Sequence, residues 1–477
     1  MGGTRSQDVL VIDLDDTLIR TDMLFETLWA TLSRRWLNCV PVLVAVQSGR
    51  AALKAKLTEL GPVPAASLPY NDDVIAQINT WRQEGGQVAL VSASDQTIVS
   101  EIAEHLGLFD AAHGSDGTTN LKGAQKAAFL KETFPEGFAY MGDSKADLEI
   151  WPHTTRAITV DAPTFLRAKV DALAVEGTHL NTRQKPLWHA LFKALRPHQW
   201  LKNVLIFLPM LLAHQMTGGT FWLALLAFIA FSLIASSVYL LNDLLDLAAD
   251  RAHPRKCKRP FAAGDLPLAW GTVLAPGLLM VGGILSALVG IQFLAIVLIY
   301  YVITTAYSFN LKRHMIIDIC TLAGLYTIRL IAGGLATGTA LSVWLAAFSI
   351  FFFFALAAIK RQAELIAGLN SGKEKADGRG YLTSDLPFIS QMAVSAGYVS
   401  VLVMALYVNS QTVQTLYSNP LPLWGICLVL LYWISRIVMI THRGQMHDDP
   451  VVFAATDKVS VICALVIAAL AVAATLL

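Results

Sequence analysis

Residues 221–250 read FWLALLAFIAFSLIASSVYLLNDLLDLAAD, an apolar run that ends in a group of acidic side chains. The apolar part, 221–241, has about the 20 residues that a helix needs to cross the hydrocarbon core of a bilayer. The carboxylates that follow, Asp243, Asp246 and Asp250, are spaced i, i+3 and i+7, which predicts that they share one face of a helix. Because acidic side chains at the end of a membrane helix usually have a function, this stretch predicts a membrane protein with a polar site at one membrane face.

This stretch contains one of nine apolar runs in the chain. Each run approaches the length of a membrane span, and they lie at 201–216, 221–241, 267–288, 291–308, 316–338, 342–359, 389–408, 421–441 and 459–477. Pro209 interrupts the first of them. The part of the chain from 196 to 477 is therefore predicted to be an all-α domain with nine transmembrane spans.

The charged loops predict how these spans are oriented. Lysine and arginine are concentrated after the second, fourth and sixth predicted spans, at Arg251, Arg255, Lys256, Lys258, Arg259, Lys312, Arg313, Lys360, Arg361, Lys373, Lys375 and Arg379. The connections after the first, third, fifth and seventh spans contain neither residue. Since cytoplasmic loops carry the excess of basic residues, we expect a multi-pass protein of the inner (cytoplasmic) membrane, with a cytoplasmic N-terminal domain and an outward C-terminus.

The acidic group after residue 241 has the chemistry of a metal–diphosphate site. Neighbouring carboxylates repel one another unless a cation lies among them, and such oxygen ligands suit Mg²⁺, which commonly bridges carboxylates to substrate phosphates. Basic side chains that could bind the remaining phosphate charge follow at once, at His253, Arg255, Lys256, Lys258 and Arg259. The alternative is a solvated loop whose basic residues only set the membrane topology.

The same segment resembles a known signature. Asn242 to Asp250, followed by His253-Pro254 and Lys258-Arg259-Pro260, resembles the first signature of the UbiA-type intramembrane prenyltransferase superfamily. Further segments resemble its decaprenyl-phosphate phosphoribosyltransferase branch, namely Arg196-Pro197, Gln199-Trp200, Lys202-Asn203, Tyr307-Ser308 with Lys312, Asp318 and Arg329, and Lys360-Arg361 with Glu364. The resemblance implies that phosphoribosyl diphosphate is the donor and a polyprenyl phosphate lipid the acceptor.

The resemblance also implies roles for individual residues. Asp243, Asp246 and Asp250 would hold Mg²⁺. The substrates would be bound by Lys202, Asn203, Asn242, His253, Lys256, Lys258, Arg259, Tyr307, Lys312, Asp318, Arg329, Lys360, Arg361 and Glu364.

One departure from the superfamily pattern concerns the donor. Ordinary prenyltransferases of this superfamily carry a second carboxylate-rich motif after a later span, where this sequence has Asp318 and the bases Lys312, Arg313 and Arg329. Fewer acids and more bases suit a pair of substrates with an additional phosphate. Two alternatives stay open here: Arg329 could be a helix-packing residue bonded to a carbonyl group, and Tyr307 could be an interfacial tyrosine.

The first part of the chain has a different pattern, in which strand and helix signals alternate. Residues 9–12, 87–91 and 138–141 have the pattern of short buried strands, and 98–106 and 124–134 have the pattern of helices. This alternation predicts an α/β domain with a parallel sheet, whose functional side chains lie at the carboxyl ends of the strands.

The ends of the predicted strands carry the side chains of a phosphoryl-transfer site. The first strand leads into Asp13-Leu14-Asp15-Asp16-Thr17, the second ends at Ser92, and Gly142-Asp143-Ser144-Lys145-Ala146-Asp147 follows the third. A carboxylate nucleophile with a second acid two residues later, beside Mg²⁺, is typical of phosphoryl transfer. With Lys122 before a helix, these pieces resemble the motifs of the haloacid dehalogenase superfamily of phosphatases.

That resemblance implies a domain at 1–161 with a helical cap at about 21–70, joined to the membrane part by a connector at 162–195. Asp13 would be the nucleophile, Asp15 the general acid/base, Ser92 a phosphate ligand and Lys122 the phosphate-neutralising lysine, with Lys126 as its alternative one helical turn later. Mg²⁺ would be held by Asp13, Asp15, Asp143 and Asp147. The alternative is an inactive relative that is kept as a scaffold.

The composition excludes several classes of protein. At 477 residues, 55% hydrophobic and 15% charged, the chain is too long and too apolar for one ordinary soluble domain. Its net charge of +1 and the lack of a nucleic-acid motif indicate no nucleic-acid partner. The five cysteines form no close pair, which argues against a disulfide framework or a zinc site.

Together these patterns predict a bifunctional membrane enzyme with one Mg²⁺ in each active site. The membrane domain would make polyprenyl-phosphoryl-5-phosphoribose, and the N-terminal domain would remove the 5-phosphate. The alternative is a UbiA-type prenyltransferase that moves an isoprenoid from a prenyl diphosphate to an aromatic or lipid acceptor, with an N-terminal domain that is a phosphatase of another substrate or a regulatory module.

Overall fold

The computed structural model describes residues 8–116, 120–183, 186–375, 379–446 and 449–476. The chain forms two compact units. The first consists of Met1–Leu195 with Tyr239–Ala275, and the second of Arg196–Val238 with Pro276–Leu477. The acidic segment at 243–250 therefore belongs to the same unit as the N-terminal sheet.

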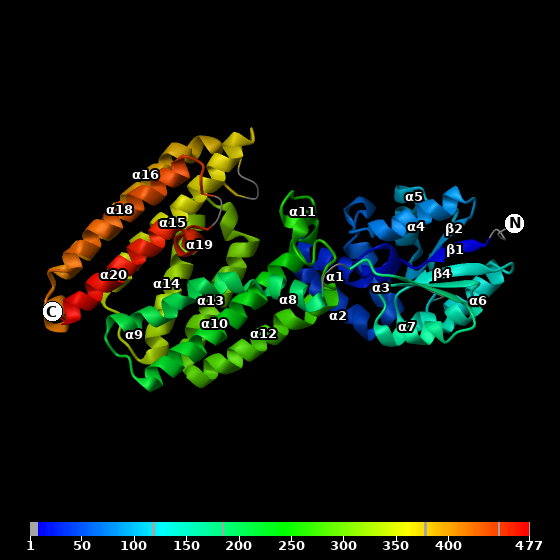
Figure 1. The fold of residues 1–477 in the computed structure, drawn as a ribbon, viewed down its shortest axis with the longest axis horizontal. Coiled ribbons are helices and arrows are strands. Elements are labelled where there is room, and N and C mark those ends of the chain that lie inside the picture. Colours follow the sequence, from blue (N-terminus) through cyan, green and yellow to red (C-terminus); the bar gives the residue numbers. More distant parts are fainter. Residues whose placement is uncertain (1–7, 117–119, 184–185, 376–378, 447–448, 477) are drawn as a thin grey trace. The chain divides into compact units, whose positions relative to one another are not determined.

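A six-stranded parallel sheet forms the centre of the first unit (Figure 1). Its strands are β1 (Val9–Ile12), β2 (Val88–Asp95), β3 (Ala111–Ser115), β4 (Phe138–Gly142), β5 (Arg156–Val160) and β6 (Glu176–Leu180). Their order is β3-β2-β1-β4-β5-β6, so β1 lies between β2 and β4. The predicted parallel α/β sheet is confirmed, and this order brings together the carboxyl ends of the three strands whose motifs the sequence identified.

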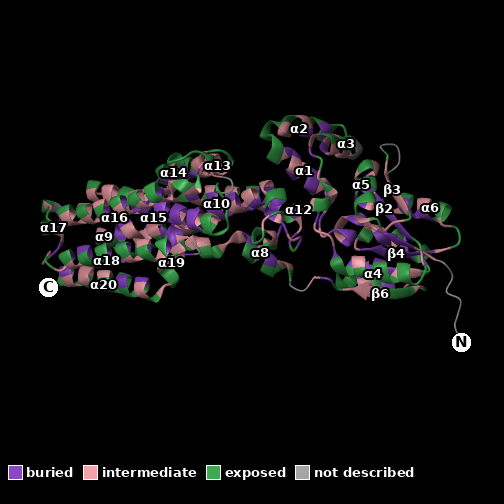
Figure 2. Ribbon diagram, turned by 90° about the horizontal axis from the view of Figure 1, so that it is seen from above, coloured by how far each residue is buried: buried purple, intermediate pink, exposed green. Residues whose placement is uncertain are grey.

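The sheet is buried because its central strands carry apolar side chains on both faces, as parallel strands covered by helices do. Val11, Leu90 and Tyr140 are fully buried, and Figure 2 shows β2 and β4 largely in the colour of buried residues. Helices of this unit include α4 (Asp72–Gln83), α5 (Gln96–Leu106), α6 (Ala124–Thr133), α7 (Thr164–Asp171) and α8 (Leu187–Leu195).

The predicted helical insertion is also present. It contains α1 (Met23–Arg34), α2 (Cys39–Gln47) and α3 (Arg50–Leu60), with a short 3₁₀ turn, η2 (Trp36–Asn38), between the first two. The side chain of Asp22 caps α1 by accepting a hydrogen bond from Leu24 N.

The predicted connector at 162–195 contributes to the sheet. It contains α7 and then β6, which pairs with β5 in parallel. The sequence missed β6 because its residues, EGTHL, are mostly polar and half-exposed at the sheet edge, so they lack the apolar signal of a central strand.

Eight helices among the described residues are long and apolar enough to cross a membrane, and the chain is a multi-pass membrane protein. They are α10 (Gly218–Leu245), α12 (Leu268–Val289), α13 (Ile291–Phe309), α14 (Ile317–Thr337), α15 (Val343–Asn370), Thr383–Val408, which contains α16 (Leu386–Val408), α18 (Leu423–His442) and α20 (Lys458–Leu476). Figure 1 shows α16, α18 and α20 side by side in the second unit. Shorter helices are α9 (Leu208–Leu212), α11 (Leu247–Arg251), α17 (Gln411–Leu416) and α19 (Pro450–Thr456).

The first of the nine predicted spans is not such a helix. Residues 201–216 lie in a 3₁₀ helix, η6 (Pro197–Phe207), followed by α9 and a turn. At about 2.0 Å per 3₁₀ residue and 1.5 Å per α residue, η6 and α9 together still extend about 30 Å. This backbone packs closely on α14, because a Cβ at Gly333 would clash with the Ile206 carbonyl oxygen. Within the described ranges, the prediction of nine spanning α-helices is therefore corrected to eight.

Candidate functional site

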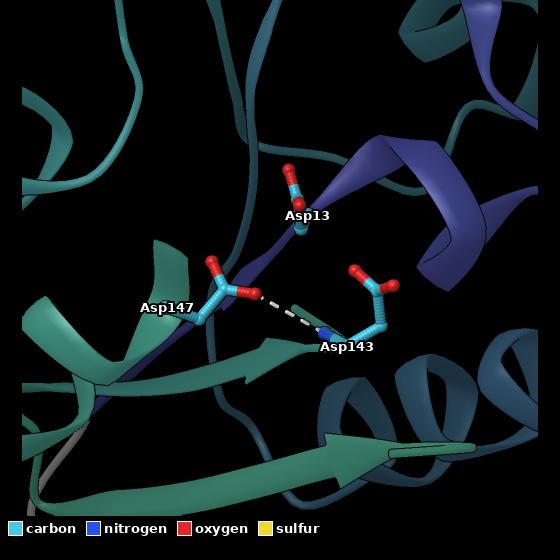
Figure 3. A group of neighbouring side chains, drawn as sticks. All are labelled: Asp13, Asp143 and Asp147. Atoms are coloured by element: carbon cyan, nitrogen blue, oxygen red, sulfur yellow. Dashed lines mark hydrogen bonds between the residues drawn. The ribbon is translucent and has the colours of Figure 1, made fainter. Parts of the chain in front are cut away.

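Three carboxylates meet at the carboxyl ends of neighbouring strands. Asp13 follows β1, whereas Asp143 and Asp147 follow β4, and each offers an oxygen within 4.8 Å of the others. Figure 3 shows the three side chains facing a common space. In the described part of the chain, this is the one cluster of three or more acidic, His or Cys ligands spaced to hold a metal ion.

Asp147 is fixed by its own turn. Its Oδ2 accepts hydrogen bonds from Ser144 N and Oγ, both at 2.9 Å, and from Asp143 N at 3.2 Å, the contact dashed in Figure 3. Its Oδ1 accepts a bond from the Tyr140 hydroxyl at 2.8 Å. Asp147 therefore holds the Asp143 backbone in place as well as adding charge to the group.

The lysine that reaches this group is Lys126. Its Nζ lies 2.8 Å from Asp13 Oδ1, and its side chain is only 3% exposed, whereas Lys122 is exposed. Helix α6 begins at Ala124, after Gly123 at a φ of 57°, so Lys126 falls in the first helical turn and Lys122 precedes it. The sequence preference for Lys122 is therefore corrected to Lys126.

Burial and the charges of neighbouring carboxylates raise the pKa values of Asp13 and Asp143. Desolvation raises the pKa of Asp143 well above its ordinary value, and the charges of Asp16 and Asp147 raise it further. Desolvation also raises the pKa of Asp13, although Lys126 opposes this shift. Because a divalent cation would relieve the repulsion and carboxylate oxygens are ligands that Mg²⁺ prefers, these residues fit Mg²⁺.

Asp15, the fourth predicted metal ligand, is not part of the group formed by the other three. Its Oδ1 accepts a hydrogen bond from Met23 N at 2.8 Å, and its Oδ2 accepts one from Ser94 Oγ at 3.0 Å. Desolvation, followed by the charges of Asp22 and Asp13, raises its pKa to about 8. A pKa of about 8 favours the protonated form at neutral pH, which is the form that a general acid needs.

Ser92 is fully buried in β2, where its Oγ accepts a hydrogen bond from Ser94 N at 3.0 Å. The sequence interpretation missed Ser94, the serine that contacts Asp15. The pairing of β2 with β3 shifts register between Val91 and Asp95, and this irregularity could not be read from the sequence alone.

The acidic segment after α10 is not one continuous helix. α10 ends at Leu245, Asp246 has non-helical φ and ψ of −97° and 12°, and α11 starts at Leu247. The predicted single helix is therefore interrupted at Asp246, whereas Asp243 and Asp250 still lie on one side of the segment, where Arg259 contacts both. Asp246 and the neighbouring Asn242 are half-buried.

Arg259 nevertheless brings the outer two acids together. Its NH1 lies 3.1 Å from Asp243 Oδ1 and 2.6 Å from Asp250 Oδ2. Asp250 is 1% exposed, burial raises its pKa, and its Oδ1 has no hydrogen-bond partner among the described residues. A buried carboxylate oxygen without a hydrogen-bond partner is well suited to bind a cation.

The basic residues that follow lie in a short loop. His253 Nδ1 accepts a hydrogen bond from Arg255 N at 3.1 Å, at the start of the 3₁₀ turn η7 (Lys256–Lys258). Lys256 and Lys258 are exposed. They are therefore accessible to an anionic substrate from the solvent side.

In the second unit, Asp318 is the centre of a buried ion cluster. Its Oδ2 lies 2.6 Å from Arg361 NH2, and its Oδ1 lies 3.2 Å from Arg379 NH1. The Tyr307 hydroxyl donates to Asp318 Oδ1 at 2.7 Å, and Arg361 also pairs with Glu364. Tyr307 is thus part of a buried polar cluster. This contact favours a polar role for Tyr307 over that of an interfacial tyrosine.

A second cluster contains a residue that the sequence interpretation missed. Asp449 Oδ2 lies 2.8 Å from Lys202 Nζ and 2.9 Å from Lys360 Nζ, and its Oδ1 accepts a bond from the Tyr326 hydroxyl at 3.1 Å. Although burial alone would raise the pKa of Asp449, the two lysines hold it below its ordinary value. Lys312 lies in the 3₁₀ turn η8 (Leu311–Arg313) and is half-buried.

Arg329 has several partners of its own. Its Nε donates to Asn203 Oδ1 at 2.9 Å, NH1 donates to the Leu325 carbonyl, and NH2 donates to the Tyr300 hydroxyl at 3.3 Å. Asn203 Nδ2 in turn donates to Ser232 Oγ at 2.9 Å. These contacts support the packing interpretation of Arg329 and give it a positioning role for Asn203.

The three clusters of the second unit carry an excess of positive charge. Five cations, Lys202, Arg329, Lys360, Arg361 and Arg379, stand with three carboxylates, Asp318, Glu364 and Asp449. This leaves two positive charges in polar groups that are mostly buried. Such an excess suits the binding of an anion.

Similarity to known proteins agrees with the membrane part of this arrangement. The model of the UbiA prenyltransferase family matches residues 203–374. Protein y4nM of Sinorhizobium fredii is 37% identical over 458 residues, which are 94% of this chain and 88% of that protein. The chain belongs to the UbiA prenyltransferase family. Decaprenyl-phosphate phosphoribosyltransferase of Mycolicibacterium smegmatis is 37% identical to this chain over 237 residues. The aligned region is 46% of this chain and 74% of that protein.

The UbiA match at 203–374 lies within the membrane part, whereas the Sinorhizobium relative extends over nearly the whole chain, including the N-terminal α/β domain. A solved substrate-bound phosphoserine phosphatase complex is 17% identical, covers 39% of this chain and 98% of that chain, and has a TM-score of 0.28.

Proposed function

We propose that the membrane domain of this UbiA family member transfers a 5-phosphoribosyl group from phosphoribosyl diphosphate to a polyprenyl phosphate, and that the N-terminal domain then removes the 5-phosphate. The observation that carries the proposal is the excess of positive charge in the second unit, where an ordinary prenyltransferase would have a second acidic motif. The name of the Mycolicibacterium relative, which is a phosphoribosyltransferase, supports the same donor.

In the transfer, the bond between ribose C1 and the diphosphate oxygen breaks, and an oxygen of the lipid phosphate forms the new bond to C1. Asp243, Asp246 and Asp250 are the proposed Mg²⁺ ligands, and the metal would supply charge neutralisation for the diphosphate. Lys202 and Lys360, which share the single carboxylate of Asp449, would offer further positive charge to the phosphates. No strong base is needed because a phosphate is already nucleophilic, so the protein contributes mainly positioning and charge stabilisation.

In the N-terminal domain, Asp13 would attack the phosphorus of the 5-phosphate and form an aspartyl phosphate, which water then hydrolyses. Asp15, protonated at neutral pH, would give its proton to the departing ribose oxygen. Lys126 would neutralise charge beside the nucleophile, and Asp143 and Asp147 would help to hold Mg²⁺, which neutralises phosphate charge.

We further propose a membrane arrangement that follows the basic loops. The protein lies in the inner membrane, with the domain at 1–161 in the cytoplasm, a connector at 162–195, the transferase domain at 196–477 and an outward C-terminus. The presence of β6 within the connector means that the sheet is complete only at Leu180.

The runner-up is transfer of an isoprenoid from a prenyl diphosphate to an aromatic or lipid acceptor, which the description of the family favours. One experiment separates the two. The purified protein is offered ribose-labelled phosphoribosyl diphosphate with polyprenyl phosphate and, separately, a labelled prenyl diphosphate with aromatic acids. Ribose label in the lipid phase supports the proposal, and prenyl transfer without ribose transfer refutes it.

The Asp13→Asn variant tests the second step. It should leave ribosyl transfer intact while the lipid product keeps its 5-phosphate, as read by mass spectrometry. Complete dephosphorylation by this variant would show that Asp13 is not the nucleophile.

A further inference from the structure

An exposed apolar face lies on the helical insertion of the N-terminal domain. Its members are Trp36, Leu37, Val40, Leu43, Val44 and Val46, between 45% and 66% exposed. Among the described residues from 8 to 195, only three other large apolar side chains are exposed to a comparable degree, namely Phe165, Trp188 and Phe192. The face is therefore a concentrated feature of this domain and not scattered surface apolarity.

The segment that carries this face is too short to span a bilayer and is not a core helix. Trp36–Gln47 is an apolar helical segment that is shorter than a membrane span. Val42 and Ala45 of α2 turn inward, while Val40, Leu43 and Val44 point to the surface. An apolar helix of this length that is not buried in the protein has the pattern of an interfacial helix.

Contacts within the first unit tie this insertion to the start of a membrane helix. Trp29 of α1 donates from Nε1 to Thr272 Oγ1 of α12 at 2.9 Å. Arg251, just after the acidic segment, forms a two-point ion pair with Glu26 of α1 at 2.6 and 3.0 Å, and Glu26 is 2% exposed. Helix α1 leads directly into the apolar segment. The exposed face is therefore attached, through α1, to the start of α12.

Charge and residue type indicate what covers the face. Arg34 and Arg35 are exposed and directly precede Trp36. Arginine and tryptophan at the edge of an apolar patch are typical of segments that bind anionic headgroups and lie at the headgroup level. We propose that the face from Trp36 to Val46 inserts into the headgroup region of an anionic bilayer and docks the N-terminal domain on the membrane.

The docked domain would keep its candidate active site close to the bilayer. Helix α1 has 12 residues, about 18 Å, and runs from Met23, bonded to Asp15, to Arg34 beside the face. A phosphate on a lipid headgroup would therefore be presented within one helix length of Asp15. This consequence, unlike the docking itself, rests on the proposed phosphatase function.

The test uses the full chain in nanodiscs containing phosphatidylglycerol. All native cysteines are replaced, Leu43→Cys carries an environment-sensitive fluorophore, and Phe165→Cys, exposed on α7, is the matched control. We expect emission shifted to shorter wavelengths and quenching by doxyl-labelled lipids for the label at position 43, and neither for the label at 165. Water-like emission at 43 would overturn the proposal, and so would a shielded label that doxyl lipids do not quench, because protein would then cover the face.

A second arm reads the consequence for catalysis. Leu43→Asp combined with Val44→Asp should slow dephosphorylation of the lipid-linked phosphoribose and leave hydrolysis of a water-soluble aryl phosphate unchanged. Equal turnover of the lipid substrate by this variant and the parent would overturn the link between docking and activity. Absence of phosphatase activity in the parent protein would count against the proposed function, whereas the lipid-quenching result would still decide the docking.

Discussion

Replacing Lys126 by methionine should impair the proposed phosphatase step far more than the same change at Lys122. Lys126 Nζ lies 2.8 Å from Asp13 Oδ1 and is nearly inaccessible, so the two groups form a desolvated, charge-assisted contact. Lys122 lies four residues earlier, before α6 begins, and its side chain is exposed. Methionine keeps the length and apolar body of the lysine side chain and removes only its charge.

The size of the effect follows from the contact. The Coulomb attraction at 2.8 Å and an effective dielectric constant of about 20 is about 6 kcal/mol before desolvation is subtracted. Hydrogen bonds to charged groups contribute a net of about 1.5–3 kcal/mol, which is the better guide because the lysine is already desolvated in the folded protein. At about 1.4 kcal/mol per factor of ten, Lys126→Met should lower kcat/KM by about tenfold to a hundredfold.

The assay measures phosphate release from an aryl phosphate and from the lipid-linked phosphoribose at saturating Mg²⁺. Lys122→Met is the matched control and should stay within about twofold of the parent, because surface substitutions have small effects. Thermal unfolding of both variants checks that any loss is not due to misfolding. If Lys122→Met loses as much activity as Lys126→Met, or more, the assignment of Lys126 is refuted.

Three further predictions concern the two metal-binding groups and the membrane core. Asp243→Asn should abolish lipid labelling while the protein stays folded, and EDTA should do the same to the parent; full turnover in either case would contradict the carboxylate assignment. Arg329→Ala should lower the thermal midpoint and weaken use of phosphoribosyl diphosphate by about tenfold or more, because it removes the donor to Asn203 Oδ1 and the side-chain donor to the Leu325 carbonyl. An unchanged midpoint would argue against the positioning role. Mg²⁺ binding to the N-terminal domain, measured by calorimetry, should tighten as the pH rises above the ordinary carboxyl range of about 4, because the raised pKa values of Asp13 and Asp143 let protons compete with the metal there. An affinity independent of pH would show that these carboxyl groups are not the ligands.

The features that the sequence predicted correctly are local ones. Long apolar runs between charged loops were sufficient to place most of the membrane helices, because span length and loop charge are properties of single segments. The central strands of the sheet were recognised in the same way, since β1, β2 and β4 are short apolar runs that end in functional side chains. Three strands, β3, β5 and β6, were missed. The edge strands β3 and β6 are more polar and incompletely buried, so they lack an apolar signal, whereas β5 is an interior strand with four buried residues.

Residues of the candidate sites that depend on backbone detail were predicted less well. The choice between Lys122 and Lys126 depends on where α6 begins. Gly123, with its positive φ, sets that start at Ala124. The acids from Asp243 onward have helical spacing, but the helix breaks at Asp246. In both cases a change of a few dihedral angles redirects a side chain without altering any pattern in the sequence.

The sequence by itself determined that this chain joins a parallel α/β domain to a membrane domain, because hydrophobic periodicity and motif order are written along the chain. Only the tertiary structure decided which distant groups meet. Asp449 neutralises Lys202 from 247 residues away, and Glu26 pairs with Arg251 from 225 residues away. No local signal marks such pairs, because the attraction between a buried cation and a carboxylate depends on their distance in space and on the exclusion of water, both of which arise only when the helices pack.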